Sequence, residues 1–123
     1  MKFLADIARD LGVSGYVGDG SAQWPAVARA DAARLIRLGL EQAPAGTRLH
    51  AVAEQAVTTR AIAEALGLPV ASIDPAAAGE HFGFIGRFFA QGMTASSEHT
   101  RALLGWTPAG PTLLEDIAAG AYG

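Results

Sequence analysis

The residues best suited to meet a small polar ligand lie in the stretch that runs from Gly18 to Asp31. A polar, glycine-rich turn comes first, then a Trp24-Pro25 pair, and then Arg29 two residues before the aspartate. An arginine close to a tryptophan and a polar loop can bind an anionic group through paired hydrogen bonds. The simpler interpretation is a surface arginine or an Arg–Asp pair, and the residues alone leave both open.

Other patterns that would carry chemistry are missing from the sequence. Gly18-Asp19-Gly20 lacks the Gly-x-Gly-x-x-Gly spacing of a phosphate loop and predicts a plain turn. The three histidines, His50, His81 and His99, are far apart and have no metal-type spacing. We expect no metal site, and no nucleophile–base pair can be named. His50 is expected to be a hydrogen-bonded core residue.

Composition limits the classes of protein to be considered. The chain has 123 residues, which suits one domain over 1–123, and a formal net charge of −3 with no basic stripe. Nucleic acid is therefore not an expected partner. The absence of cysteine fits a reducing cytoplasm, and no apolar run is long enough to span a membrane. Residues 1–6 include an acid and do not match a signal peptide.

Hydrophobic spacing predicts a chain that is mostly helical with a few short strands. Helices are expected at 2–11 and 32–42, the second with Asp31 as N-cap after a short strand that holds Arg29. Strands are expected at 13–17, at 49–53 and at 70–73. The 49–53 run is almost continuously apolar, which favours a strand buried on both faces of a parallel sheet. The helix at 2–11 has no N-cap before it, which favours a chain cut from something longer.

Four further helices are predicted from their end signals. One begins at Thr58 or Thr59 and closes at Leu66-Gly67-Leu68-Pro69. A phenylalanine-rich helix begins at Asp74-Pro75 and continues to about residue 90, and its wide apolar surface favours burial or an interface. Ser96 or Ser97 caps a short helix that ends at Gly105-Trp106, and Thr112 opens a last one with a capping box.

In this order, the segments resemble the C-terminal part of an extended or atypical short-chain dehydrogenase/reductase of the NAD-dependent epimerase/dehydratase type. The resemblance is carried by Gly-Tyr-Val-Gly-Asp-Gly at 15–20, by the run from Trp24 through Leu35, by 49–54 with 58–65, and by Leu-Leu-Gly-Trp-Thr-Pro at 103–108. It covers nearly the whole chain. Related sequences often carry a histidine at the position of Ala28.

The resemblance implies an α/β fold, the substrate-domain portion of a Rossmann-type enzyme without its cofactor domain. The Gly-x-x-Gly-x-x-Gly motif and the Tyr-x-x-x-Lys pair of this family are absent from the chain. We therefore expect no catalytic residue, no cofactor bound by this chain alone, and no dehydrogenase activity; an intact parent would use NAD(P) on a small or sugar-like carbonyl or alcohol. Substrate contacts are predicted at Trp24, Arg29, Ser96 and Ser97.

A corollary concerns partners. In this family the strand at 49–53 belongs to the large parallel sheet of the cofactor domain, so here it would have an unpaired edge. The chain is then expected to rearrange, to form a homo-oligomer, or to need a separate cofactor-domain chain. The alternative function is a non-catalytic interaction module that uses the helix around Phe82–Phe89 as its interface. A small independent enzyme is the least favoured reading.

Overall fold

The computed structural model describes residues 1–122; Gly123, the last residue of the expected domain, lies outside the described residues. The fold is mixed α/β, as predicted, with about half of the residues helical and four short strands. The elements are α1 (Lys2–Leu11), β1 (Ser14–Val17), β2 (Gln23–Ala26), α2 (Arg29–Gln42), β3 (Glu54–Thr58), α3 (Thr59–Ala65), β4 (Val70–Ile73), η1 (Pro75–Ala77), α4 (Ala78–Phe82), η2 (Gly83–Ile85), α5 (Gly86–Gln91), α6 (Glu98–Leu104) and α7 (Leu113–Ala118).

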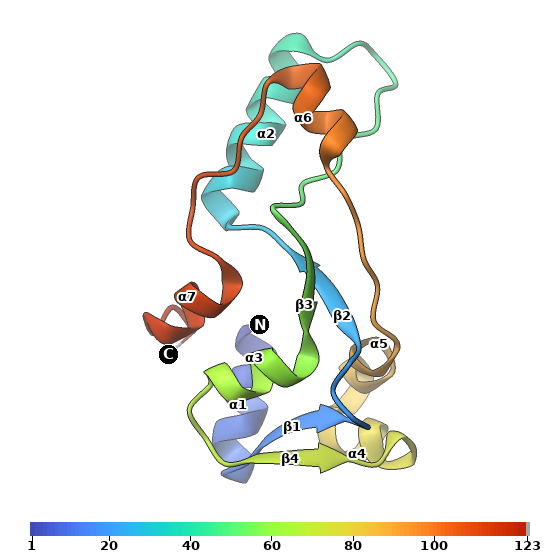
Figure 1. Cartoon of the computed structure of the whole chain (residues 1–123), viewed down its shortest axis with the longest axis vertical. Coiled ribbons are helices and arrows are strands. Elements are labelled where there is room, and N and C mark those ends of the chain that lie inside the picture. Colours follow the sequence, from blue (N-terminus) through green and yellow to red (C-terminus); the bar gives the residue numbers. More distant parts are fainter. Residues whose placement is uncertain (123) are drawn as a thin grey trace.

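The strands form two separate two-stranded sheets, one at the lower end and one in the middle of the molecule (Figure 1). At the lower end β1 pairs in parallel with β4, and Ser14 lies opposite Val70. In the middle β2 pairs antiparallel with β3, with an irregularity between Trp24 and Ala26. Pro25, the third residue of β2, has no N–H to donate, which fits the irregular ladder there.

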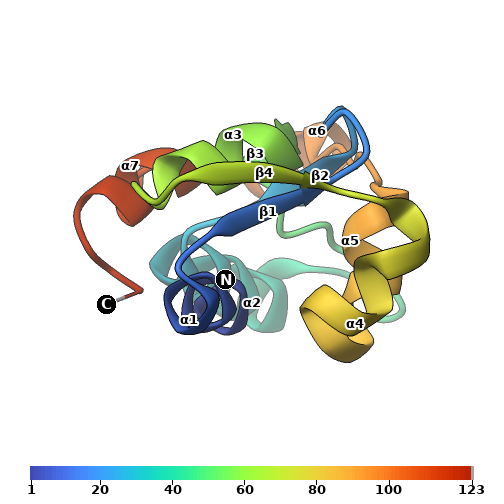
Figure 2. The ribbon, with the colours of Figure 1, turned by 90° about the horizontal axis from the view of Figure 1, so that it is seen from below.

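Buried side chains form three clusters instead of one continuous core. The lower cluster joins β1 to the phenylalanine-rich segment, where the rings of Phe82 and Phe89 meet edge to face at 5.0 Å. The middle cluster packs Val57 and Ile62 against Ile117 of α7. The upper cluster lies between α2 and α6 and contains Leu35, Leu104 and Trp106. Figure 2 shows α1 and α2 on one side of the strands and α3 with α7 on the other.

Most local end signals are confirmed. Thr58 is the N-cap of α3, and its hydroxyl accepts from the backbone N–H of Ala61. The carboxylate of Asp74 accepts from the N–H of Ala76, at the start of the next helical segment. Thr112 and Glu115 form the expected capping box of α7. Gly105 ends α6 in the left-handed conformation, and Trp106 then folds into the upper cluster. Each of these signals is local, so the sequence carries it directly.

The predicted entry to α2 is wrong. The helix begins at Arg29 and not at Ala32, its N-cap is Ala28, and Asp31 lies inside the first turn. Arg29 is therefore the first helical residue and is not part of a strand, because the strand before it ends at Ala26. The carboxylate of Asp31 does not cap its own helix. It accepts hydrogen bonds from the backbone of a distant loop, which outweighs the local preference for the N-cap position.

The predicted strand at 49–53 is also wrong. This segment has no regular secondary structure, and the strand begins at Glu54 and runs to Thr58, antiparallel to β2. The prediction that His50 is a core residue is wrong as well. His50 is exposed, although its Nδ1 lies 2.9 Å from the carbonyl oxygen of Ser96. Val52 is buried, but His50 and Ala51 are exposed, so the run at 49–53 is not buried on both faces.

The long helix expected from Asp74 to about residue 90 is broken into four pieces. Gly83 takes a positive φ of 68°, which ends α4, and the chain resumes as η2 and then α5. The break lets α5 turn back on α4, where a Cβ on Gly86 would lie 2.3 Å from the carbonyl oxygen of Ala78. Among the described residues, no helix is long and apolar enough to cross a membrane.

Candidate functional site

A hollow of about 550 Å³ lies against β2 and is the best-formed candidate for a ligand site. Its volume falls in the range of small-molecule sites. The lining residues come from α1, β2, α3, the phenylalanine-rich segment and the C-terminal end of the chain. They include Met1, Leu4, Trp24, Val27, Phe88 and Tyr122. The wall is mostly apolar, so most of its binding energy would come from burial of apolar surface.

Trp24 is the predicted site residue that the structure places in this hollow. It lies opposite Val57 in the β2–β3 pair. Its indole Nε1 is buried and has no hydrogen-bond partner among the described residues. A buried donor without an acceptor costs about 1–3 kcal/mol. Because Nε1 is not exposed, Trp24 presents apolar ring surface to the hollow, and its side chain would have to shift before this donor could reach a bound molecule.

Arg29 does not line the hollow. It is exposed at the first position of α2, where a cation at a helix N-terminus meets the unfavourable end of the helix dipole. No ion pair of Arg29 is found in the described part of the chain. The guanidinium stays free to meet an anion, but the structure does not bring it together with Trp24 in one cavity.

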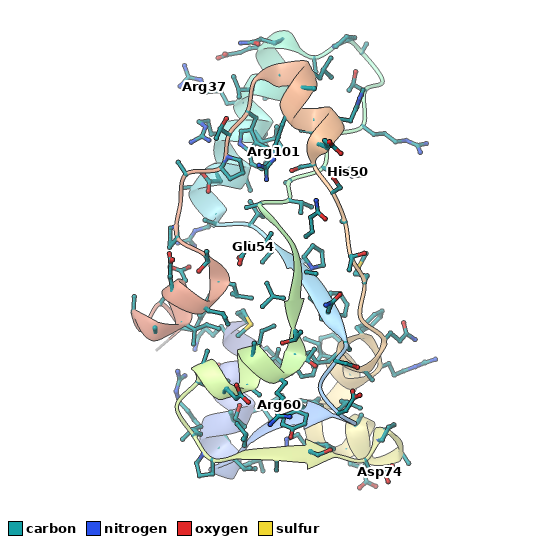
Figure 3. The ribbon with its side chains drawn as sticks, in the orientation of Figure 1. Arg37, His50, Glu54, Arg60, Asp74 and Arg101 are labelled. Carbon is teal, nitrogen blue, oxygen red and sulfur yellow. The ribbon has the colours of Figure 1, made fainter. Side chains whose placement is uncertain are left out.

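Ser96 and Ser97 line a second hollow of about 380 Å³, together with Ala53, Gln55, Glu98 and Arg101. Figure 3 shows Arg101 directed from α6 toward the chain that precedes β3. Its Nε donates to Ser97 Oγ at 2.8 Å, and its terminal nitrogen donates to the carbonyl oxygens of Val52 and Ala53. Ser97 Oγ in turn donates to Val52 O at 2.5 Å. The hydroxyl of Ser97 is therefore engaged within the chain, and Ser96 is the exposed member of the pair.

The glycine-rich turn at 18–21 serves the fold, as the plain-turn reading predicts. The carbonyl of Gly20 accepts from the N–H of Arg60 and from the hydroxyl of Thr59. A Cβ on Gly20 would lie 2.5 Å from Arg60 Cβ. Asp19 accepts from the hydroxyl and N–H of Ser21, and these bonds lower the pKa of its carboxyl. The polar groups of the turn are thus used internally.

The turn also fails as a cofactor cradle. A dinucleotide site of the Rossmann type needs a glycine loop that opens a helix, so that the helix N-terminus faces the pyrophosphate. Here the loop joins β1 to β2, and a strand follows it. The residues present therefore do not fit an NAD(P) pyrophosphate at this turn. The described residues also contain no group of three or more His, Cys, Asp or Glu side chains that could hold a metal.

Asp31 has a role that the local sequence did not indicate. Its carboxylate accepts from the backbone N–H groups of Ala109 at 3.1 Å and Gly110 at 2.8 Å, and it lies 3.4 Å from Arg34. The two backbone bonds, followed by the Arg34 charge, lower the pKa of the Asp31 carboxyl against the opposing effect of burial. The backbone carbonyl of Asp31 accepts from Trp106 Nε1 at 3.0 Å. The Gly-Trp-Thr-Pro stretch at 105–108 stands out in the sequence, but nothing in the sequence indicates that Trp106 bonds to Asp31.

Sequence comparison finds two longer relatives. The chain is 43% identical over 126 residues to the uncharacterized protein C2A9.02 of Schizosaccharomyces pombe, and the match covers 99% of this chain and 43% of that protein. It is 47% identical over 123 residues to the uncharacterized protein YLL056C of Saccharomyces cerevisiae, covering 97% of this chain and 41% of the relative. The chain thus spans less than half the length of the curated relatives it matches. No family model matches the chain.

Structure comparison finds the same fold in part of a larger structure. The chain matches the structure of RMD from Pseudomonas aeruginosa complexed with NADPH, with a TM-score of 0.61 and 15% sequence identity. The match covers 96% of this chain and 37% of that one. At this identity the likeness establishes a shared fold. It does not by itself establish an activity.

Proposed function

We propose that this chain is the substrate-binding portion of an NAD(P)-dependent oxidoreductase, and that the hollow against β2 holds the substrate. The observation that carries the proposal is the match of 96% of the chain to 37% of a structure that contains NADPH. The two curated relatives extend this pattern, because each is more than twice as long as its matched part. The cofactor would be held by the part of the longer protein that this chain does not span.

The substrate class follows from the chemistry of the hollow. Trp24 offers a flat apolar face and an indole donor that lacks a partner. A small carbonyl compound or alcohol, including a sugar-like one, has the apolar faces and the oxygen atoms that such a wall can bind. Arg29 and Ser96 remain proposed contacts for polar substituents, from the N-terminus of α2 and from the second hollow.

The division of labour is tested by measuring NADPH binding with titration calorimetry on two proteins. This chain alone is expected to bind neither NADH nor NADPH and to leave both unoxidised. The intact S. pombe relative is expected to bind at least one of them and to oxidise it in the presence of a panel of aldehydes, ketones and reducing sugars. A relative that binds neither cofactor would overturn the proposal, and so would turnover by this chain alone.

The substrate hollow is tested on this chain by saturation-transfer NMR with glyceraldehyde, dihydroxyacetone and fructose as probes. We expect weak binding that Trp24→Ala abolishes and Trp24→Phe reduces, because the phenyl ring keeps the apolar wall but loses the donor. Phe84→Ala is the matched control, since this aromatic residue is exposed away from the hollow. Equal signals for the wild type and Trp24→Ala would exclude Trp24 as a contact.

The alternative function is a non-catalytic interaction module. It is favoured by the exposure of Phe84 and Phe88, at 75% and 56%, with Phe3 5.5 Å from Phe84 between ring centroids. Sedimentation of the chain at rising concentration separates the two proposals. An interface on the exposed rings predicts self-association that Phe3→Ser together with Phe84→Ser removes, whereas neither of these two rings lines the substrate hollow.

A further inference from the structure

Phe88 on α5 belongs to the walls of two neighbouring hollows. It lines the hollow of about 550 Å³ against β2. It also lines a hollow of about 440 Å³, whose other lining residues are Phe84, Arg87 and Gln91. Because one side chain borders both, the two hollows are adjacent. Together they are called the trough below.

Helical spacing explains why Phe88 lies between the two hollows. Successive residues of a helix are rotated by about 100°, so Arg87 and Gln91, four residues apart, share one face of α5. Phe89 lies on another face and is buried, with 5% of its surface exposed. Phe88 falls between these faces and stays 56% exposed. The run Arg-Phe-Phe at 87–89 thus places a cation, an exposed ring and a buried ring next to one another.

Arg87 carries a positive charge that the described chain does not neutralise. Arg37 and Arg60 each pair with a glutamate four residues later, at 3.0 and 2.9 Å. Arg87 has the uncharged Gln91 at that position. Arg87 is exposed, and no ion pair of its guanidinium is found among the described residues.

The rest of the trough has no charged side chain among its described lining residues. The hollow against β2 is lined by apolar and aromatic side chains, of which Trp24 and Tyr122 carry a polar atom. The second hollow adds the ring of Phe84 and the amide of Gln91. The trough is therefore mostly apolar, with a single cationic side chain at one end. A ligand that complements it has an apolar body and one negative charge.

We propose that the trough binds an amphiphilic monocarboxylate, with its apolar chain across the ring of Phe88 and its carboxylate at Arg87. A planar guanidinium can hold a carboxylate through two parallel hydrogen bonds, and the Gln91 amide is a further donor on the same face. The inference rests on the proposed function in one respect, because it places the reacting carbonyl or hydroxyl in the hollow against β2. The substrate class is then an oxo acid or a hydroxy acid.

An NMR titration with 7-oxooctanoate and the neutral 7-oxooctanamide tests the role of charge. The chain is acetylated at Met1, because Met1 lines the trough and its α-amino group would be a second cation there. We expect the acid to bind about three- to tenfold more tightly than the amide at low salt. The difference should shrink in about 0.5 M salt. Equal affinities of the two probes at low salt would overturn the proposal.

Substitution of Arg87 tests where the charge acts. In Arg87→Gln the affinity for 7-oxooctanoate is expected to fall to that for the amide, and Arg87→Lys should keep part of the difference. Arg48→Gln is the matched control, because Arg48 is an exposed arginine that does not line the trough. Equal losses in Arg87→Gln and Arg48→Gln would mean a general effect of net charge and would overturn the proposal.

The length of the probe tests whether the ligand lies across Phe88. The acid 4-oxopentanoate keeps both end groups but lacks three methylene groups, and we expect it to bind about tenfold more weakly than 7-oxooctanoate. Phe88→Ala should weaken 7-oxooctanoate and its amide by the same factor, since it removes apolar wall and no charge. Equal affinities of the two acids in the wild type would overturn the proposal, because no chain would then be buried across the ring.

Two further outcomes are distinguished. Shifts of the α5 amides that follow protein concentration without any probe, and that block its binding, would identify a second copy as the occupant and overturn the proposal. None of these titrations needs nucleotide. NADPH binding by the S. pombe relative, with no preference for the acid in this chain, would leave the proposed function intact and refute the acid site. A preference for the acid that depends on Arg87, with a relative that binds no NAD(P), would support the acid site and refute the proposed function.

Discussion

Asp31 connects more of the upper half of the molecule than any local pattern indicated. Its carboxylate holds the backbone of Ala109 and Gly110, and its carbonyl oxygen holds the indole of Trp106. All three partners lie more than seventy residues further along the chain. The side chain is only 3% exposed, so its charge depends on these donors and on Arg34 for compensation.

The lowered pKa of the Asp31 carboxyl predicts a loss of stability in acid. A folded-state pKa below the unfolded value contributes stability above the unfolded pKa of about 3.9, and this contribution disappears as the pH falls through the folded pKa. We expect the free energy of unfolding of the wild type to fall below about pH 4. Asp31→Asn should be less stable at pH 7 and should show a flatter profile. Urea unfolding from pH 3 to pH 7 measures both.

Trp106→Phe is the control for that experiment. It removes buried volume and the bond to the Asp31 carbonyl, and we expect a loss of about 1–3 kcal/mol. It removes no titrating group, so the loss should be similar at every pH. If Asp31→Asn gave a profile parallel to the wild type, as Trp106→Phe should, the acid sensitivity would belong to another group.

At the scale of elements, the close contact between α4 and α5 depends on the absence of a side chain at Gly86. A Cβ there would meet the carbonyl group of Ala78 at 2.3 and 2.7 Å. We expect Gly86→Ala to destabilise the chain by about 1–3 kcal/mol, because the two segments must separate. Gly79→Ala is the matched control on α4, since nothing lies within 4 Å of its Cβ position.

The sign of the control sharpens the test. Alanine is favoured over glycine inside a helix by up to about 1 kcal/mol, so Gly79→Ala should leave the chain unchanged or slightly more stable. Thermal unfolding of the two variants measures the difference. A loss at Gly79→Ala as large as that at Gly86→Ala would mean that the helical segments respond to backbone stiffness and not to the contact.

The sequence predicted these elements where the deciding interaction is local. The cap at Thr58 or Thr59, the start at Asp74 and the capping box at Thr112 were predicted because their partners lie within a few residues. The same reasoning failed at Asp31, where partners from a distant loop take the carboxylate. It also failed at 49–53, where a strand was predicted but begins only at Glu54. An apolar run indicates burial, but it does not determine which segments pack against it.

The candidate site was predictable in part for the same reason. Trp24 was identified as a candidate from its residue type and its neighbours in the sequence, and it lines the hollow. The rest of the wall comes from α1, α3, the phenylalanine-rich segment and residues near Tyr122, which only the tertiary fold brings together. The wide apolar surface of the Phe82–Phe89 stretch was a visible signal for part of that wall. No sequence pattern indicated that the hydroxyl of Ser97 would form hydrogen bonds with Val52 and Arg101.

At the scale of the whole molecule, the exposure of Ile36 and Leu40 on α2, at 63% and 85%, predicts how the isolated chain behaves in solution. We expect it to bind a hydrophobic dye such as ANS in its folded state. Ile36→Ser together with Leu40→Ser should reduce dye binding and change stability by no more than about 1 kcal/mol, because both side chains are largely exposed. Leu35→Ser, on the buried side, should instead unfold the chain. Unchanged dye fluorescence in the double variant would place the uncovered surface elsewhere.

The two tryptophans lie in different parts of the molecule, and this gives the protein a built-in optical readout. Trp106 is 1% exposed in the cluster between α2 and α6, and Trp24 borders the hollow beside β2. The chain contains no other tryptophan. In the Trp24→Phe variant the remaining tryptophan emission reports on the upper cluster. In the Trp106→Phe variant it reports on the surroundings of β2 in the middle of the molecule. Two emission curves recorded during one denaturant titration would therefore reveal whether the separate clusters melt together or in sequence.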